Sequence, residues 1–305
     1  MRQESVFTKV WRVLTPLATY YILQIIAMIG VSAAFAMRFV SQIDLNGTNI
    51  DSVYASLMES VFNSILDISF WCTVFSAAAV IPFLLMFRKK DRKRAAMQGR
   101  SVRYTKAGSI AYAIFPLLAC AASLAGNNLM LMSGFFQGTQ SAAVVSGEIV
   151  YSQSLLATII GVGVIAPAAE EMIFRVVMYD RVREYMRPLY AGLITSALYA
   201  SLHMGLVQMI YGFLLGAMFA YGYEKTHDWK IPVAMHICLN IMDILVTDTS
   251  LFRFMYASRS VMIGITLAAC AAVVGLMYLA EMKISSQAVL AEGQESTDGE
   301  EADRK

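Results

Sequence analysis

Charged residues are scarce in this sequence for its length. Only 15% of the 305 residues are charged, whereas 58% are hydrophobic and the mean hydropathy is +0.58. A soluble globular domain carries about 25% charged residues. The composition therefore excludes an ordinary soluble domain and predicts a polytopic membrane protein of the all-α class, because helices are the usual way for long apolar runs to cross a bilayer.

Cysteine and histidine are also scarce. The four cysteines lie inside apolar runs without paired spacing, so we expect no disulfide framework and interpret them as small buried side chains. All three histidines fall between His203 and His236, and these two lie within apolar segments. The sequence therefore has one candidate chemical centre.

Eight apolar segments are predicted to span the membrane as a helical bundle. They are residues 14–37, 61–87, 107–133, 151–175, 189–204, 206–223, 231–246 and 261–282. The first is longer than the apolar core of a cleaved signal peptide, so we expect it to be retained.

Basic residues are distributed unevenly between these segments. Residues 88–106 hold nine Lys and Arg residues against the single acid Asp91, whereas residues 41–60 and 134–150 hold none. By the positive-inside rule the basic loop is cytoplasmic, which places both termini in the cytoplasm, and we expect the plasma membrane of a prokaryote. We interpret the loop as a topology determinant near lipid headgroups and expect no nucleic-acid partner.

The chain divides into four predicted parts. Residues 1–133 contain three N-terminal spans, residues 151–246 contain the polar centre, and residues 261–282 form the final span. Residues 283–305 are acidic and polar and lack aromatic residues, a composition typical of disorder.

Two adjacent carboxylates interrupt the end of the fourth span. Glu170 and Glu171 follow an apolar run, and Arg175 lies four residues after Glu171, on the same helix face. A charge at the centre of a membrane helix costs roughly 2.5–3.5 kcal/mol, so such a pair needs a partner, a cavity or a function. Pro167 is predicted to kink the span just before the carboxylates, and irregular helices at membrane depth usually line a cavity.

The same four-residue spacing recurs downstream. Tyr199 and His203 share one helix face, His236 and Asn240 share another, and Asp243 continues the second face. Taken singly, the carboxylates could lie at the headgroups and the histidines could be packed or interfacial residues. Ionisable groups seldom cluster inside a membrane without a function, so their conjunction favours a site.

In this order the motifs resemble the CPBP family of intramembrane proteases, which includes type II CAAX prenyl endopeptidases and the Abi group of bacteriocin-processing and self-immunity proteins. The motifs are Glu170-Glu171-x-x-x-Arg175, Tyr199-x-x-x-His203 and His236-x-x-x-Asn240. The resemblance covers residues 152–246 and departs from the family where Tyr199 replaces the usual Phe. It implies an all-helical bundle with a conical active-site cavity inside the membrane.

The resemblance also implies roles for individual residues. Glu170 would be the general base that activates a water molecule, helped by His203. His236 and Asn240 would polarise the scissile carbonyl and stabilise its oxyanion. This assignment agrees with physical chemistry, because a neutral amide can donate to a developing oxyanion without repelling it.

Two mechanisms stay open within the family. Glu170, His203 and His236 form an adequate ligand set for a catalytic Zn²⁺ with one open position, and family members are commonly called metalloproteases. Other members are regarded as metal-free glutamate proteases, and this chain has no His-Glu-x-x-His motif. We predict the metal site, with the metal-free mechanism as the alternative; in both, Glu171 pairs with Arg175 and orients the site.

Two functions from different classes follow. The first is an intramembrane endopeptidase that cleaves a membrane-associated protein or peptide near the cytoplasmic side of the bilayer. The second is a non-catalytic protein of the same fold, either an immunity or scaffold protein or a transporter. The complete set of proposed catalytic residues favours the first function.

Overall fold

The computed structural model describes residues 5–42, 50–99, 106–133, 153–203, 205–248, 254–255 and 257–302. These residues are helical almost throughout, and no strand occurs among them. The predicted all-α bundle is therefore confirmed. The predicted outer loop 134–150 lies outside the described residues.

Seven segments of the described chain are long and apolar enough to cross a membrane. Six of them are the single helices α1 (Val6–Gln42), α2 (Ile50–Met97), α3 (Ala111–Met132), α9 (Leu206–Thr226), α10 (Lys230–Asp248) and α11 (Arg259–Ala302). The seventh covers Leu155–Arg183 and is built from several short helical segments.

The remaining predicted span, the fifth (residues 189–204), corresponds to a shorter helix. This helix is α8 (Pro188–Ala200), which has 13 residues. At 1.5 Å per residue it is about 20 Å long, less than the roughly 30 Å thickness of the hydrocarbon core. It packs against α9 and η3 (Met172–Tyr179) with one face, and its other face, which includes Leu189 and Tyr190, is exposed.

Several helices extend beyond the predicted boundaries. Helix α2 begins inside the predicted outer loop 41–60 and continues into the basic segment, ending at Met97. Helix α11 continues to Ala302 through the tail for which the composition predicts disorder. Both extensions contain Ala, Glu, Gln or Lys, which favour helix, and neither contains proline.

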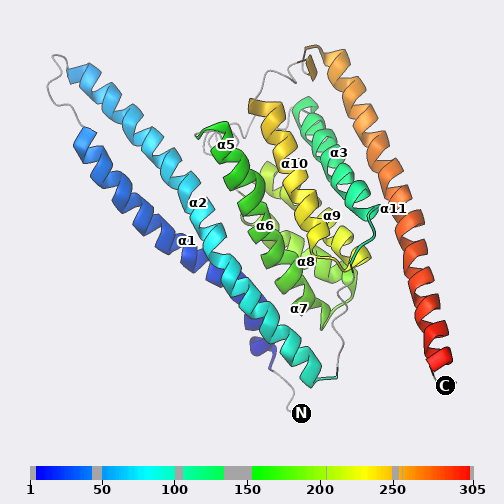
Figure 1. Ribbon diagram of the computed structural model, residues 1–305. Coiled ribbons are helices and arrows are strands. Elements are labelled where there is room, and N and C mark those ends of the chain that lie inside the picture. Colours follow the sequence, from blue (N-terminus) through cyan, green and yellow to red (C-terminus); the bar gives the residue numbers. More distant parts are fainter. Residues whose placement is uncertain are drawn as a thin grey trace.

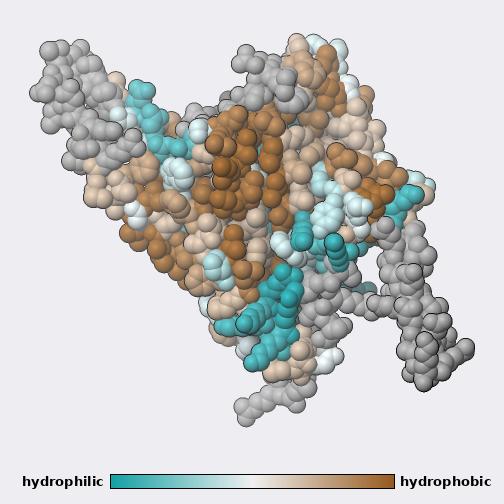
Figure 2. All heavy atoms as spheres, viewed as in Figure 1, coloured by the Kyte–Doolittle hydropathy of each residue, from teal (hydrophilic) through white to brown (hydrophobic). Residues whose placement is uncertain are grey.

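The helices form two packed groups (Figure 1). Helix α1 packs along α2 on one side, and α3 packs against α10 and α11 on the other. Helices α8 and α9 pack against each other between these groups. Hydrophobic residues cover the middle of the face in Figure 2, and hydrophilic residues gather near its lower end, where α2 ends.

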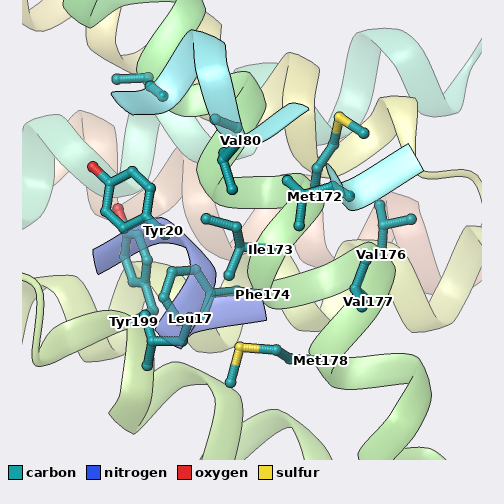
Figure 3. Close-up of a cluster of buried hydrophobic side chains, with 14 residues drawn as sticks. Leu17, Tyr20, Val80, Met172, Ile173, Phe174, Val176, Val177, Met178 and Tyr199 are labelled. Atoms are coloured by element: carbon teal, nitrogen blue, oxygen red, sulfur yellow. The ribbon is translucent and has the colours of Figure 1, made fainter. Parts of the chain in front are cut away.

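Two clusters of buried apolar side chains correspond to these groups. The first joins α1, α2, α8 and the fourth span, and includes Tyr20, Ile173, Phe174 and Tyr199 (Figure 3). The second joins α3, α9, α10 and α11. Because lipid is as apolar as these side chains, close packing rather than exclusion of water holds such helices together in a bilayer. Tyr199 of the first cluster faces Phe219 of the second, with ring centroids 6.5 Å apart, so the two clusters meet at α8 and α9.

A half-buried polar network fastens one end of the first group. The Arg12 guanidinium of α1 donates to Glu184 at 2.6 and 2.8 Å and to Asp91 of α2 at 3.2 Å. Arg181 donates to Asp91 at 2.7 Å and also to the backbone carbonyl of Arg12. Charge-assisted hydrogen bonds of this kind fix the ends of α1, α2 and the fourth span relative to one another.

The four cysteines are free thiols. Cys72 is buried, and Cys120 and Cys270 are half-buried. Cys238 is exposed, so the interpretation of all four as buried side chains was wrong for this residue. A thiol is apolar enough to face lipid without a partner.

Candidate active site

The fourth span departs from regular α-helix on both sides of the two carboxylates. After the single turn α5 (Leu155–Thr158), the π-helix η2 (Ile159–Ile165) precedes α6 (Ala166–Glu171), and a second π-helix, η3 (Met172–Tyr179), leads into α7 (Asp180–Arg183). Irregularity was predicted here, and it takes the form of wide π-helical turns. Such turns are frequent at functional sites, because they rotate side chains out of the α-helical register.

Pro167 explains one contact of the site. In the π-helical register the Ala166 N–H bonds the Gly161 carbonyl, five residues earlier. The next carbonyl, that of Val162, would be paired with residue 167, but proline has no N–H. Asn240 of α10 fills this place, since its Nδ2 donates to the Val162 oxygen at 3.0 Å. An amide nitrogen carries two N–H groups, so the second one is left for a ligand in the cavity that Asn240 lines.

Glu171 is completely buried and binds two partners. Its Oε1 lies 3.0 Å from Nη1 of Arg175 and 2.9 Å from Nδ1 of His236. Arg175 is also completely buried, donates to the Gly216 carbonyl at 2.9 Å and lies over the ring of Tyr199 at 4.8 Å. The predicted contact between Glu171 and Arg175 is therefore present. Glu171 also contacts His236, the histidine of the third motif.

This contact fixes the orientation of His236. A carboxylate accepts hydrogen bonds only, so Nδ1 must carry the proton that is shared with Glu171. The other nitrogen, Nε2, then faces the hydroxyl of Tyr199 at 3.4 Å and Oε2 of Glu170 at 4.0 Å. The imidazole also stacks on the ring of Phe219, with 4.9 Å between centroids. The ring is therefore held on three sides.

Glu170 differs from its neighbour in access. Its side chain is 18% exposed, whereas that of Glu171 is 0% exposed. Glu170 lines a cavity of about 520 Å³ together with Tyr199, His203 and His236. A molecule in the cavity can therefore reach Glu170 but not Glu171.

His203 lies in the connection between α8 and α9. Its Nδ1 is 3.3 Å from the carbonyl of Tyr199, and its ring meets the Tyr199 ring edge-on at 5.0 Å. Helix α9 begins after Gly205, whose φ of 89° is a conformation that glycine adopts without strain. Gly212 lets the imidazole lie against α9, because a Cβ at that position would be 3.1 Å from His203 Nδ1.

Zinc requires ligand atoms that lie closer together than those of Glu170 and His236. Two ligand atoms of a tetrahedral zinc ion lie roughly 3.3–3.6 Å apart, given metal–ligand distances of about 2.0–2.2 Å. The separation between Glu170 Oε2 and His236 Nε2 is wider, at 4.0 Å. Among the described residues no group of three or more His, Cys, Asp or Glu side chains is arranged to hold a metal ion. The side chains as placed do not fit zinc, and the Zn²⁺ site at Glu170, His203 and His236 stays a prediction.

All six predicted site residues lie together, four on the cavity and two directly behind it. The four that line the cavity are Glu170, His203, His236 and Asn240. Glu171 and Arg175 are buried behind them, where Glu171 bonds both Arg175 and His236.

Sequence reasoning missed the polar contacts of three other residues. No polar contact was predicted for the Tyr199 hydroxyl, which lies 3.4 Å from Nε2 of His236. The sequence signal for this contact was the phenol in place of the usual Phe. Ser123 and Tyr211, which join Asp243 in the cavity region, carry no motif. Their positions depend on how α3, α9 and α10 pack.

Comparison with known proteins agrees with this geometry. Residues 152–242 match the family described as "Type II CAAX prenyl endopeptidase Rce1-like". The chain is 22% identical over 233 residues to a protein of Bacillus subtilis (strain 168) named "Putative membrane peptidase YdiL", covering 75% of this chain and 86% of that protein. No solved structure gives a significant match.

The matched region coincides with the part of the chain that builds the site. Residues 152–242 contain all three motifs and most of the cavity lining. The apolar helices on either side make the protein an integral, multi-pass membrane protein. Over residues 152–242 the chain is therefore similar to the type II CAAX prenyl endopeptidases, and over most of its length it is similar to the protein named "Putative membrane peptidase YdiL".

Proposed function

We propose that this protein is an intramembrane endopeptidase in which Glu170 activates a water molecule for attack on a peptide bond. The observation that carries the proposal is the arrangement of Glu170 and His236. The carboxylate that faces the cavity lies 4.0 Å from His236 Nε2, and the other nitrogen of this ring is held by a second, buried carboxylate. Acid–base catalysis commonly uses a base, a partner of the base and a group that orients this partner, here Glu170, His236 and Glu171.

The separation of the two groups suits a bridging water. A water molecule at about 2.8 Å from both atoms fits between Glu170 Oε2 and His236 Nε2. Glu170 would take one proton from this water while the water oxygen attacks the scissile carbonyl carbon. Glu170 would then give the proton to the leaving amine as the carbon–nitrogen bond breaks, so that the carboxylate is regenerated.

The neighbouring donors support the rest of the reaction. The second N–H of the Asn240 amide and the hydroxyl of Tyr199 are neutral donors that line the same cavity. Such groups stabilise a tetrahedral oxyanion when they are fixed before the reaction begins. The Asn240 side chain is fixed by its hydrogen bond to the Val162 carbonyl. His203 lies beside the second donor, because its Nδ1 contacts the Tyr199 carbonyl.

The location of the cavity supports a membrane-associated substrate. It is walled by α2, α3, α9, α10 and the fourth span, which are helices long enough to cross a bilayer. A segment of a membrane-associated protein or peptide can reach such a cavity, and a CAAX-like prenylated protein is one member of this class. We place both termini in the cytoplasm on the basis of the basic segment 88–106.

Cleavage of a membrane-tethered fluorogenic peptide library by protein purified into lipid nanodiscs tests this proposal. We expect wild-type cleavage to be lost in Glu170→Gln and His203→Ala variants that keep the wild-type melting temperature. A chelator followed by zinc add-back tests the metal: reversible loss of cleavage supports the zinc mechanism, and unchanged cleavage supports the metal-free one. Equal cleavage by wild type and Glu170→Gln would overturn the proposal in favour of a non-catalytic protein.

A further inference from the structure

The cavity contains a second carboxylate, at some distance from Glu170. Asp243 lines the cavity from α10, seven residues after His236. Seven residues of helix correspond to about 10 Å along the axis. Asp243 is therefore part of the same space as the proposed catalytic pair, but too far along α10 to take part in the same proton transfers.

The hydrogen bonds of Asp243 leave most of its capacity unused. The Ser123 hydroxyl lies 2.9 and 2.8 Å from the two carboxylate oxygens and 2.6 Å from the Tyr211 hydroxyl. Ser123 has one proton to give, so it donates to Asp243 and accepts from Tyr211. The carboxylate, which has about four acceptor sites, thus receives one hydrogen bond from this pair.

Asp243 also has no positive partner in the described part of the chain. The ion pairs formed there join other residues. The described cavity lining contains two carboxylates, Glu170 and Asp243, and no lysine or arginine. Carboxylates at membrane depth almost always pair with an opposite charge or line a substrate pathway, because an isolated charge there is costly. This wall of the cavity is thus suited to a cation that arrives with the substrate.

We propose that Asp243 is a specificity subsite that binds the lysine or arginine side chain of the peptide substrate. The inference rests on the proposed peptidase function and adds the chemical character of the substrate to it. An extended peptide covers about 3.3–3.6 Å per residue, so a subsite about 10 Å from the catalytic pair lies roughly three residues from the scissile bond. Asn127 and Gln208, which also line the cavity, supply neutral polar groups beside this position.

The test uses pairs of membrane-tethered peptides and the full-length protein in nanodiscs. Lysine is moved through four positions on each side of the cleaved bond, and each lysine peptide is paired with one that carries norleucine instead. We expect lysine at one position, about three residues from the bond, to raise kcat/KM about tenfold or more, as a charge-assisted hydrogen bond allows. The gain should appear mainly in KM, because the contact is distant from the reacting atoms.

Variants then assign this preference to Asp243. Asp243→Asn should cleave the norleucine peptide like wild type and lose the lysine preference, and Asp243→Glu, which keeps the charge, should retain it. Asp67→Asn is the matched control, because Asp67 is a carboxylate of α2 that bonds Gln153 outside the described cavity lining. An unchanged lysine preference in Asp243→Asn, or no charge preference in the wild type, would overturn the subsite.

Binding separates this inference from the proposed function. The lysine and norleucine peptides are titrated into Glu170→Gln and into the double variant Glu170→Gln/Asp243→Asn. Tighter binding of lysine by the first protein but not by the second supports the subsite, whether or not turnover is detected. If the preference for the lysine peptide is the same in both proteins, the subsite is overturned. Loss of cleavage in the single variant Glu170→Gln would still support the peptidase function.

Discussion

Nδ1 of His236 lies 2.9 Å from Oε1 of Glu171, and this bond links the third motif of the site to the first. The two residues come from different spans, 65 positions apart in the sequence. Because Glu171 holds one nitrogen of the ring, the other points to Glu170 across 4.0 Å. The adjacent carboxylates therefore have different tasks in our account: Glu171 positions the histidine, and Glu170 meets the water.

Glu171→Gln tests the positioning task. The substitution removes the charge that His236 and Arg175 share, so we expect kcat to fall on the order of 10²-fold or more. Unfolding should also become easier by about 3–5 kcal/mol, because Arg175 is left as an unpaired buried charge. Cleavage kinetics and the melting temperature in nanodiscs measure the two effects.

The double variant Glu171→Gln/Arg175→Met separates these effects. Removing both charges should restore part of the stability, because no unpaired ion remains, but it should not restore kcat. A single variant Glu171→Gln with wild-type kcat would contradict the role that we give to Glu171.

Tyr199→Phe tests the phenol hydroxyl. Its 3.4 Å contact with His236 is long for a hydrogen bond, and the related proteases usually carry Phe at this position. We expect the variant to fold normally and to keep kcat/KM within about tenfold of the wild type, since such a bond contributes roughly 0.5–1.5 kcal/mol. A loss of two orders of magnitude would instead make the hydroxyl a principal oxyanion donor.

Gly216→Ala tests the close packing around Arg175. A Cβ at residue 216 would lie 3.0 Å from Arg175 Nη2 and 3.1 Å from the Tyr199 ring. We expect a loss of about 1–3 kcal/mol, because overpacking displaces these neighbours, and reduced activity through the displaced Arg175. Gly192→Ala is the control, since its Cβ would meet only Ala220 Cβ at an ordinary 3.6 Å. Equal melting temperatures for the two variants would contradict this interpretation.

Asp228 gives the fold a predictable dependence on pH. It lies just before α10 and accepts hydrogen bonds from the Tyr112 hydroxyl at 2.6 Å, the Ala107 N–H at 3.0 Å and the Lys230 N–H at 3.1 Å. Burial raises the pKa of the Asp228 carboxyl, but these hydrogen bonds outweigh burial and hold its pKa below the ordinary value. The bonds therefore stabilise the folded state above the ordinary pKa of about 3.9, and this stabilisation is lost as the pH falls through the lower folded-state value.

Asp228→Asn measures this contribution. At pH 7 the variant should unfold more easily by about 1–2 kcal/mol, the usual effect of losing a capping carboxylate. The difference from wild type should shrink as the pH falls below 4. A melting-temperature difference that stays constant from pH 3 to pH 8 would contradict this assignment.

The elements that could be predicted are those that depend on local patterns. The apolar runs located the long helices, because a bilayer requires about 20 apolar residues in a row. The three motifs located the site, because each contains polar or aromatic residues four positions apart, a spacing that brings side chains together on a helix. The length of α8 was less predictable, since the apolar run 189–204 continues past Ala200, where the helix ends.

The contacts that could not be predicted depend on helix register and tertiary packing. The bond between Asn240 and Val162 exists because a π-helical register brings the Val162 carbonyl opposite Pro167, and no pattern in the sequence specifies that register. The hydrogen bond between Ser123 and Asp243 likewise requires α3 and α10 to pack with one particular shift along their axes. Such contacts follow from the packed bundle and not from any one segment.

The most direct test of the account compares Glu170→Gln with the wild type on the peptide that the wild type cleaves best. Both proteins should have the same melting temperature, and Asp67→Asn should cleave like the wild type. We predict that Glu170→Gln loses at least about 10³-fold in kcat/KM, because the amide cannot take a proton from water. Cleavage by Glu170→Gln at the wild-type rate would contradict the central claim that Glu170 is the base.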